Sequence, residues 1–259
     1  MSRGTVVDIL KLRDSFIKYQ QLCNDEKEMK SDKWYALLDK TGWPYHILCA
    51  IGTANTVIRF LTNGNSVLVC SQLGSDRTPL VVGLALILID PYYRTMEGFR
   101  VLIEREFLSF GHQFRTRLRN APKGQTNIPN EKVYIPIFFM FLDGVYQIMA
   151  QAPLAFEFNL RYLKKIAVHA SSLKFGTFLC DNEKEREMLG VQENTISLWS
   201  YLEQYNKREK YLNMFYNKEN AKGCLFIVPI AVRSYIWTAF YSRWTPSKVT
   251  HFKEYPKEM

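Results

Sequence analysis

The chain has 259 residues, 47% of them hydrophobic and 14% aromatic, which is enough for one large domain with a substantial core. Its 34 basic and 25 acidic side chains give a net charge of +9, which favours anionic partners such as membranes or phosphoinositides. No nucleic-acid-binding motif and no Cys-x-x-Cys pair is present, so nucleic acid, a zinc site and a disulfide framework are not expected.

The apolar spacing in the first part of the chain predicts three helices, over 5–23, 34–38 and 44–61. A short apolar run over 66–70 then predicts a strand that is buried on both faces. Thr78 is a candidate N-cap, and Pro79 a candidate first residue, for a helix that ends near residue 89. This helix is apolar on every side, so we expect it at the centre of the domain.

The second part of the chain predicts further helices, over 96–108, 135–149, 155–170, 195–205 and 231–241. A basic segment over 111–132 is expected to be a loop. Only one strand is visible, although a buried strand needs neighbours on both sides. Either other strands are hidden in weak patterns, or the chain begins partway into a larger domain; the fold class expected is a helix-rich α/β fold.

Residues 66–78 join the apolar run to a loop of small residues, an arginine and the buried helix. Such a loop directs backbone N–H groups and the positive end of the helix dipole towards one point, at which a phosphate can bind. The residues expected to bind phosphate are Gln72, Leu73, Gly74, Ser75, Asp76 and Arg77.

This loop and several later motifs resemble the myotubularin phosphoinositide phosphatases. The matching segments are Gly74-Ser-Asp-Arg-Thr, Asp90-Pro-Tyr-Tyr-Arg-Thr-Met-Glu-Gly-Phe, Phe107-Leu-Ser-Phe-Gly-His-Gln-Phe, Phe156-Glu-Phe-Asn, Phe175-Gly-Thr-Phe-Leu, Ser197-Leu-Trp and Arg243-Trp. The resemblance covers about 8–245 and the later part of that family's phosphatase domain. It implies a cysteine-phosphatase-like fold without the N-terminal strands of the sheet, a partial phosphatase domain over 1–245 and a polar tail over 246–259. No cofactor or metal is expected.

Active members of this family carry His-Cys-Ser-Asp-Gly-Trp-Asp-Arg-Thr, in which five residues separate the nucleophilic cysteine from the arginine. Counting back from Arg77 places Ser71 at the nucleophile position and Cys70 at the histidine position. A serine hydroxyl ionises far above neutral pH, and no partner base is visible, whereas a cysteine in such a loop can reach a pKa of about 3.5–7.5. Cys70 cannot simply substitute, because six residues separate it from Arg77.

Two further positions of the loop also depart from the family pattern. Leu73 stands where active members have the first aspartate, and Ser75 stands where they have tryptophan. Asp76 is retained, and the resemblance implies that it would be the general acid. Arg77 keeps the bidentate geometry that suits phosphate, although it could instead only tie down the loop through a carboxylate.

The resemblance and the missing nucleophile together predict a catalytically inactive pseudophosphatase that acts as a regulatory or interaction module. Its sequence looks closest to the set-binding-factor branch of the family. The partners implied are a phosphoinositide headgroup and an active myotubularin-family protein. With no apolar run long enough to span a bilayer, a cytoplasmic location is expected, with peripheral binding to endosomal membranes.

Two other hypotheses remain open at the level of sequence. The first is an active phosphatase that removes the 3-phosphate of phosphatidylinositol 3-phosphate or 3,5-bisphosphate with Cys70 as the nucleophile. The second is a truncated remnant that binds no ligand.

Four other features of the sequence have simple structural interpretations. His112 is expected to be a hydrogen-bonded structural histidine, and Cys70 a small buried thiol. Glu104 and Glu106 are expected to lie on a solvated helix face or to pair with nearby arginines. A cluster of three arginines is expected to be solvated, with contact to anionic lipid headgroups as the alternative: Arg115, Arg117 and Arg119.

Overall fold

The computed structural model describes residues 9–25, 27, 31–120, 133–219, 221–230 and 235–242. The expected tail over 246–259, the Arg243-Trp244 match and most of the basic loop over 111–132 lie outside these residues. Within the described ranges the chain is helical and contains no strand. The extended pairing found there is an isolated antiparallel bridge between Phe158 and Leu212.

The N-terminal helices confirm the expected pattern. They are α1 (Ile9–Asn24), α3 (Trp34–Thr41) and α4 (Trp43–Thr62), which pack against one another. Gly42 separates the last two because its φ of 75° places it in the left-handed region, where glycine is favoured and a helix ends. Pro44 lies in the first turn of α4, as its fixed φ predicts.

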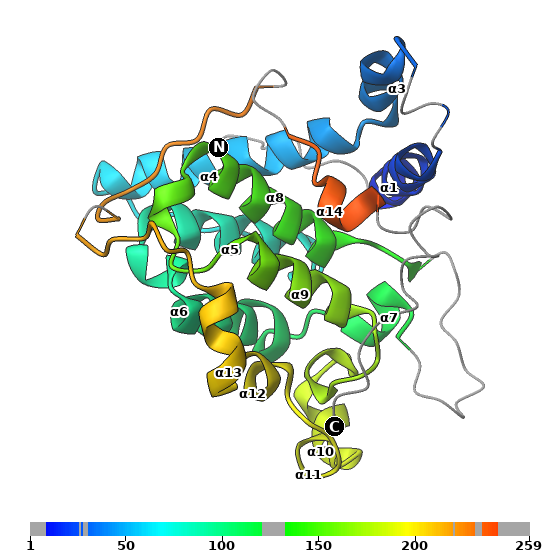
Figure 1. Ribbon diagram of the computed structural model, residues 1–259, viewed down its shortest axis with the longest axis vertical. Helices are drawn as coiled ribbons and strands as arrows, with labels where there is room; N and C mark the ends of the chain where they lie inside the picture. The colour runs from blue at the N-terminus through cyan, green and yellow to red at the C-terminus, as the bar shows by residue number, and fades with distance from the viewer. Residues whose placement is uncertain are drawn as a thin grey trace.

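Two nearly all-apolar helices, α5 (Arg77–Ile89) and α8 (Ile137–Gln151), occupy the centre of the molecule, as expected (Figure 1). They approach closely because each presents a glycine to the other. A Cβ at Gly83 would lie 2.9 Å from the Phe141 ring, and a Cβ at Gly144 would lie 2.9 Å from Leu84. α4 packs against both helices, so the start of α5 is held on a rigid base.

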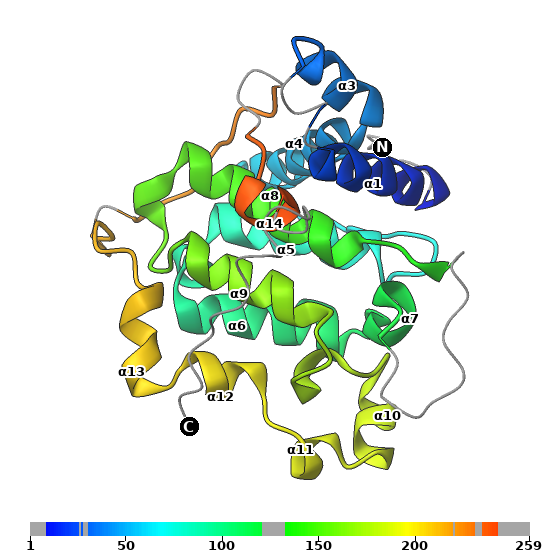
Figure 2. The ribbon, with the colours of Figure 1, turned by 45° about the vertical axis from the view of Figure 1, so that its right-hand side comes forward.

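Shorter helices surround this centre (Figure 2). After α5 come η1 (Pro91–Arg94), α6 (Met96–Ile103), the π-helical turn η2 (Glu104–Ser109) and α7 (Phe114–Leu118). After α8 come η4 (Pro153–Ala155), α9 (Leu160–Ala170), η5 (Gly176–Phe178), α10 (Glu183–Met188), α11 (Val191–Asn194), α12 (Leu198–Leu202), α13 (Tyr205–Arg208), η6 (Glu209–Tyr211) and α14 (Thr238–Tyr241). α7 lies within the segment that the sequence predicted to be a loop.

The strand expected over 66–70 is wrong. These residues have no regular secondary structure, and Leu68 is 89% exposed rather than buried. A strand requires backbone partners, and the described residues place none beside this segment. The buried thiol expected at Cys70 is wrong for the same reason, since the side chain lies exposed at the end of the segment.

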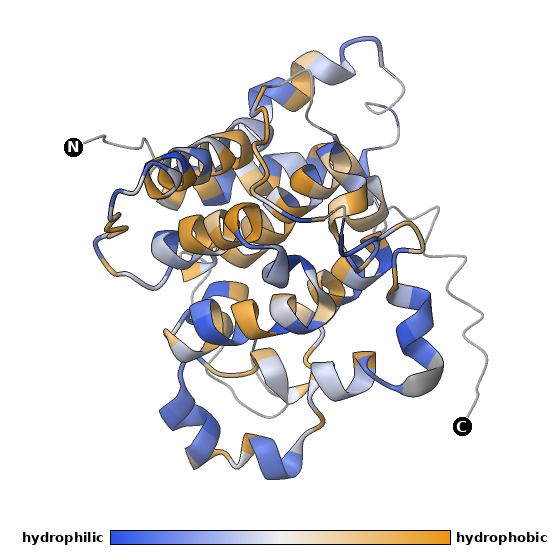
Figure 3. Ribbon diagram, turned by 90° about the vertical axis from the view of Figure 1, so that its left-hand side faces the viewer, coloured by the Kyte–Doolittle hydropathy of each residue, from blue (hydrophilic) through white to orange (hydrophobic). Residues whose placement is uncertain are grey.

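Hydrophobic residues concentrate along the helices at the centre, whereas hydrophilic residues dominate the outermost short helices (Figure 3). Phenylalanine rings fill much of the core, and Phe99, Phe107, Phe138 and Phe141 are completely buried. None of the helices in the described ranges has both the length and the apolar character needed to cross a bilayer.

Candidate phosphate-binding site

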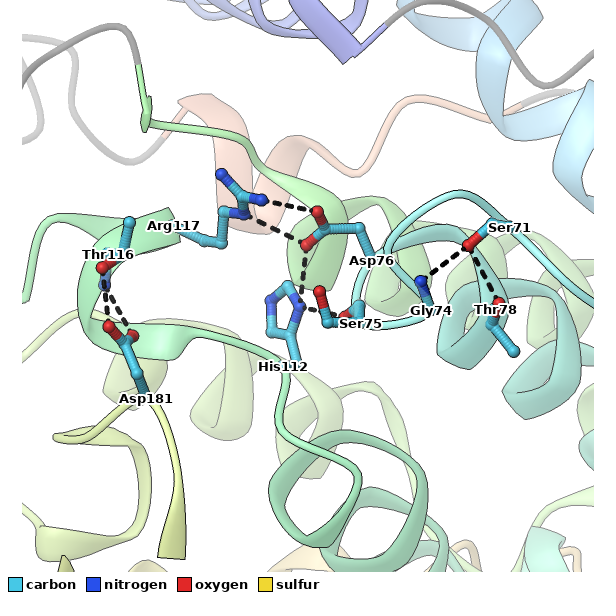
Figure 4. A network of polar contacts seen from close by, with 9 residues as sticks. All are labelled: Ser71, Gly74, Ser75, Asp76, Thr78, His112, Thr116, Arg117 and Asp181. Carbon is cyan, nitrogen blue, oxygen red and sulfur yellow. Dashed lines mark hydrogen bonds and ion pairs between the residues drawn. The ribbon is translucent and has the colours of Figure 1, made fainter. Parts of the chain in front are cut away.

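The loop over 71–76 leads directly into α5 and folds around the hydroxyl of Ser71. The backbone N–H of Gly74 donates to Ser71 Oγ at 3.2 Å, and Thr78 Oγ1 lies 3.0 Å from the same oxygen (Figure 4). Gly74 permits this turn because its φ is +73°, a conformation that other residues rarely adopt. The loop therefore closes on the position at which the family's nucleophile would stand.

The N-terminus of α5 differs from the expected cap. The helix begins at Arg77, so Pro79 is its third residue rather than its first. Thr78 does not cap the helix, because it lies inside the first turn and its hydroxyl contacts Ser71. Asp76 occupies the N-cap position without a side-chain capping bond. The first-turn amides thus lack a side-chain cap and present the positive end of the helix dipole to the loop.

Arg77 is half-buried at the start of α5 and has no partner in the part of the chain that the structure describes. No carboxylate or carbonyl among the described residues pairs with its side chain, and its Nε atom is buried without a hydrogen bond. The alternative that Arg77 ties down the loop through a carboxylate therefore has no counterpart in the described part of the chain. Leu73 does not fill the loop either, since 69% of it is exposed.

Asp76 points away from Ser71 and into a buried ion pair (Figure 4). Arg117 donates from Nε to Oδ1 at 3.1 Å and from Nη2 to Oδ2 at 2.8 Å, and Asp76 is only 2% exposed. Burial alone would raise the pKa of Asp76, but the contacts with His112 and Arg117 hold it below its ordinary value. At neutral pH this group is therefore a carboxylate, without the proton that a general acid must donate.

His112 supports the loop through contacts with Ser75 and Asp76, which confirm the structural role expected of it. Its Nδ1 atom lies 2.9 Å from the carbonyl oxygen of Ser75 and 3.3 Å from Asp76 Oδ1. Because a carbonyl only accepts hydrogen bonds, Nδ1 carries the proton. The ring is 1% exposed and packs edge to face against Phe107 and Phe114.

The three arginines expected to form one cluster have separate roles. Arg117 is buried against Asp76, Arg115 lies 3.7 Å from Glu185, and Arg119 is exposed with a φ of 56°. They therefore do not form one solvated or lipid-facing surface. Nothing in the local sequence distinguishes Arg117 from its neighbours, so its part in the site was missed.

The backbone of α7 is fixed to the loop that precedes α10. Asp181 accepts hydrogen bonds from the Thr116 N–H at 2.8 Å and from the Thr116 hydroxyl at 2.6 Å. The Arg117 carbonyl accepts a hydrogen bond from the Ile135 N–H at 3.0 Å. These contacts hold Arg117 in place on the side that faces Asp76.

Two other groups, Glu106 and Cys70, show no arrangement that would make them reactive among the described residues. Glu106 is buried and pairs with Arg105 at 2.7 Å, which confirms its expected role as an arginine partner. Cys70 is exposed and has no polar partner among the described residues. No imidazole or carboxylate in those ranges is bonded to Ser71, and those ranges contain no cluster of three or more His, Cys, Asp or Glu side chains placed to hold a metal ion. The described residues thus place a positive helix terminus and Arg77 beside Ser71, without a hydrogen-bonded base for its hydroxyl.

Comparison of the sequence with known proteins identifies the family of this chain. The sequence model of the myotubularin-like phosphatase domain matches residues 3–187. The human phosphatidylinositol-3,5-bisphosphate 3-phosphatase MTMR4 is 37% identical over 242 residues, which are 91% of this chain and 19% of the relative. Human myotubularin-related protein 9 is 35% identical over 258 residues, which are 96% of this chain and 46% of the relative.

A third relative, the phosphatidylinositol-3-phosphate phosphatase MTMR7 of Pongo abelii, is 36% identical over 237 residues, which are 90% of this chain and 34% of the relative. The chain thus spans less than half the length of each of these proteins. The family match nevertheless extends over most of the chain and includes the loop over 71–76 and α7. The chain therefore belongs to the family of myotubularin-like phosphatase domains.

Proposed function

We propose that the chain is a catalytically inactive member of its family that still binds a phosphoinositide headgroup at the loop over 72–77. One observation carries this proposal. Among the described residues, the Ser71 hydroxyl has no hydrogen-bonded base, and the side chain of Arg77, at the start of α5, has no carboxylate or carbonyl partner. The loop has lost the group that attacks phosphorus and has kept the group that holds phosphate.

The lack of attack follows from the chemistry of the hydroxyl. Ser71 has no hydrogen-bonded base among the described residues, and a serine requires one to act as a nucleophile near neutral pH. Binding makes smaller demands on the loop. A guanidinium and uncapped helix amides form charge-assisted hydrogen bonds to an anion, each worth about 1.5–3 kcal/mol.

The ligand class follows from the relatives. The names of two of them state activity on phosphatidylinositol 3-phosphate and 3,5-bisphosphate, so 3-phosphorylated phosphoinositides are the ligands proposed here. We propose a regulatory module in the cytoplasm, peripheral on endosomal membranes, that acts with an active family member. Residues 1–245 would form the later part of a cysteine-phosphatase-like domain.

The first experiment measures binding. Purified protein is titrated with vesicles that contain phosphatidylinositol 3-phosphate or 3,5-bisphosphate, and with vesicles that lack both lipids. We expect Arg77→Ala to weaken binding at least about tenfold, because it removes the bidentate contact to phosphate. Arg161→Ala is the matched control, since Arg161 is exposed on α9 and its loss changes the net charge equally. Equal binding by both variants would contradict the proposal.

The second experiment measures turnover. The wild-type protein is expected to release no phosphate from either lipid, whereas the double change Cys70→His, Ser71→Cys restores the family pattern and should gain activity. The alternative function, a phosphatase that uses Cys70, has the opposite signature. Turnover by the wild-type protein that is lost in Cys70→Ser would establish that alternative and refute inactivity.

A further inference from the structure

We infer that Arg117 is a positioning residue for the anion site: it holds Asp76 and thereby keeps that carboxylate from neutralising Arg77. The inference rests on the proposed function, in which Arg77 binds phosphate. It concerns a buried residue of α7, 40 positions further along the chain, which would not itself contact the ligand.

Two arginines elsewhere in this protein pair with the acidic residue that follows them in the sequence. Arg13 Nη2 lies 2.9 Å from Asp14 Oδ1, and Arg105 Nε lies 2.7 Å from Glu106 Oε1. Both pairs are adjacent in the sequence, as Asp76 and Arg77 are. A direct pair between Asp76 and Arg77 is therefore within reach of adjacent side chains, but it does not form.

The carboxylate of Asp76 is instead saturated from the other side. Arg117 forms two parallel hydrogen bonds to its two oxygens, and His112 lies 3.3 Å from one of them. Asp76 and Arg117 are 2% and 8% exposed, so water does not weaken this pair. Bidentate pairs of this kind are the stronger ion pairs in proteins, and their geometry fixes the carboxylate plane. The side chain of Asp76 is therefore turned away from the loop (Figure 4).

This arrangement separates two charges that stand next to each other in the sequence. The negative charge of Asp76 is neutralised by Arg117, and the positive charge of Arg77 remains without a counterion among the described residues. An incoming phosphate therefore meets an unpaired guanidinium. Without Arg117, the freed carboxylate would lie beside Arg77 and compete with the phosphate for it.

The experiment is a double-mutant cycle on the full chain, with vesicles that contain phosphatidylinositol 3-phosphate as the probe. We expect Arg117→Met to weaken binding at least about tenfold, because the freed carboxylate would pair with Arg77. We expect the double variant Arg117→Met, Asp76→Asn to return to within about threefold of the wild-type affinity. It removes the competing charge and leaves no unpaired buried ion.

The rescue separates competition from simple support of the loop. If Arg117 only braced the loop, the double variant would remain as weak as Arg117→Met, and the inference would be overturned. Unchanged binding by Arg117→Met alone would overturn it as well. Failure of the wild-type protein to bind any phosphoinositide vesicle would overturn the proposed function and this inference together, so the two failures are distinguishable.

Asp76→Asn alone provides a second test if Arg117→Met does not fold. The inference predicts binding at least as tight as in the wild-type protein, because Asp76 is already held away from Arg77 and the variant removes a negative charge near the loop. Loop support predicts weaker binding, because the ion pair is lost. A folded Asp76→Asn protein, verified by circular dichroism and a cooperative thermal transition, with weakened binding would overturn the inference.

Discussion

At position 71 a hydroxyl occupies surroundings that would suit a thiol. Ser71 Oγ accepts the Gly74 N–H and contacts Thr78 Oγ1 at the N-terminus of a buried helix. The same surroundings lower the pKa of a thiol, because they donate hydrogen bonds and carry positive potential. They cannot bring the pKa of a serine hydroxyl near neutral pH. Under the proposed function, the loop would keep surroundings that attract an anion while lacking a thiol at position 71.

Cysteine reactivity tests the placement of individual thiols. Cys70 and Cys224 are exposed, whereas Cys23 is completely buried and burial raises its pKa to about 12. We expect iodoacetamide at pH 8 to alkylate Cys70 and Cys224 first and Cys23 at least about a hundredfold more slowly, because only an accessible thiolate reacts. Peptide mass spectrometry over time measures the rates. Denatured protein is the control, in which all three thiols should react alike. Equal rates in the native protein would contradict the burial of Cys23.

The candidate site residues that lie on one stretch of chain could be proposed from the sequence, and their role stays a prediction. The spacing before Arg77 identifies Ser71, and a glycine at position 74 matches the left-handed turn observed there. It did not locate Arg117, because the ion pair with Asp76 joins segments 41 residues apart. Such a pair depends on where α7 packs, and no local pattern carries that information.

Among the elements, the long helices followed their apolar patterns, whereas the five-residue helix α7 was not expected. α4 and α8 begin and end within two residues of the expected bounds, because a buried stripe repeats over several turns. α7 has only five residues, too few to show a helical period. The apolar run over 66–70 suggested a strand, but an extended segment becomes a strand only with a partner, and hydropathy does not reveal one.

The join between η1 and α6 leads to a test of close packing. A Cβ at Gly98 would lie 1.9 Å from the backbone oxygen of Tyr92, which cannot move without breaking the turn. We therefore expect Gly98→Ala to lower the free energy of unfolding by about 3 kcal/mol or more, measured by urea denaturation. Glu97→Ala is the matched control, because that side chain is exposed one residue earlier. Equal stability of the two variants would show that the turn can relax.

Across the whole molecule, one buried carboxylate joins helices from both ends of the chain. Asp143 of α8 is 1% exposed and accepts hydrogen bonds from Trp43 Nε1 at 3.2 Å, Tyr241 Oη at 2.7 Å and Gln147 Nε2 at 3.0 Å. Trp43 lies at the start of α4, and Tyr241 ends α14. These three donors explain how a charged group is tolerated in an otherwise apolar helix.

The same carboxylate makes the stability of the molecule depend on pH. Burial raises the pKa of Asp143 to about 6, although its three hydrogen-bond donors act to lower it, whereas an unfolded aspartate titrates near about 3.9. The folded state therefore holds the proton more tightly. The resulting stabilisation is fully present below about pH 4 and is lost as the pH rises through about 6, a change of about 3 kcal/mol.

Asp143→Asn isolates this contribution, because asparagine does not titrate. The variant loses some stability at every pH. Its amide N–H group would face Gln147 Nε2, which now donates a hydrogen bond to Asp143 Oδ1. Urea denaturation of both proteins at pH 4, 5, 6 and 7 gives the difference in the free energy of unfolding, wild type minus variant. We expect this difference to fall by about 2 kcal/mol between pH 4 and pH 7, because at pH 4 part of the unfolded aspartate is already ionised. Other titrating groups cancel in the subtraction, so a constant difference would show that Asp143 does not change its protonation over this range.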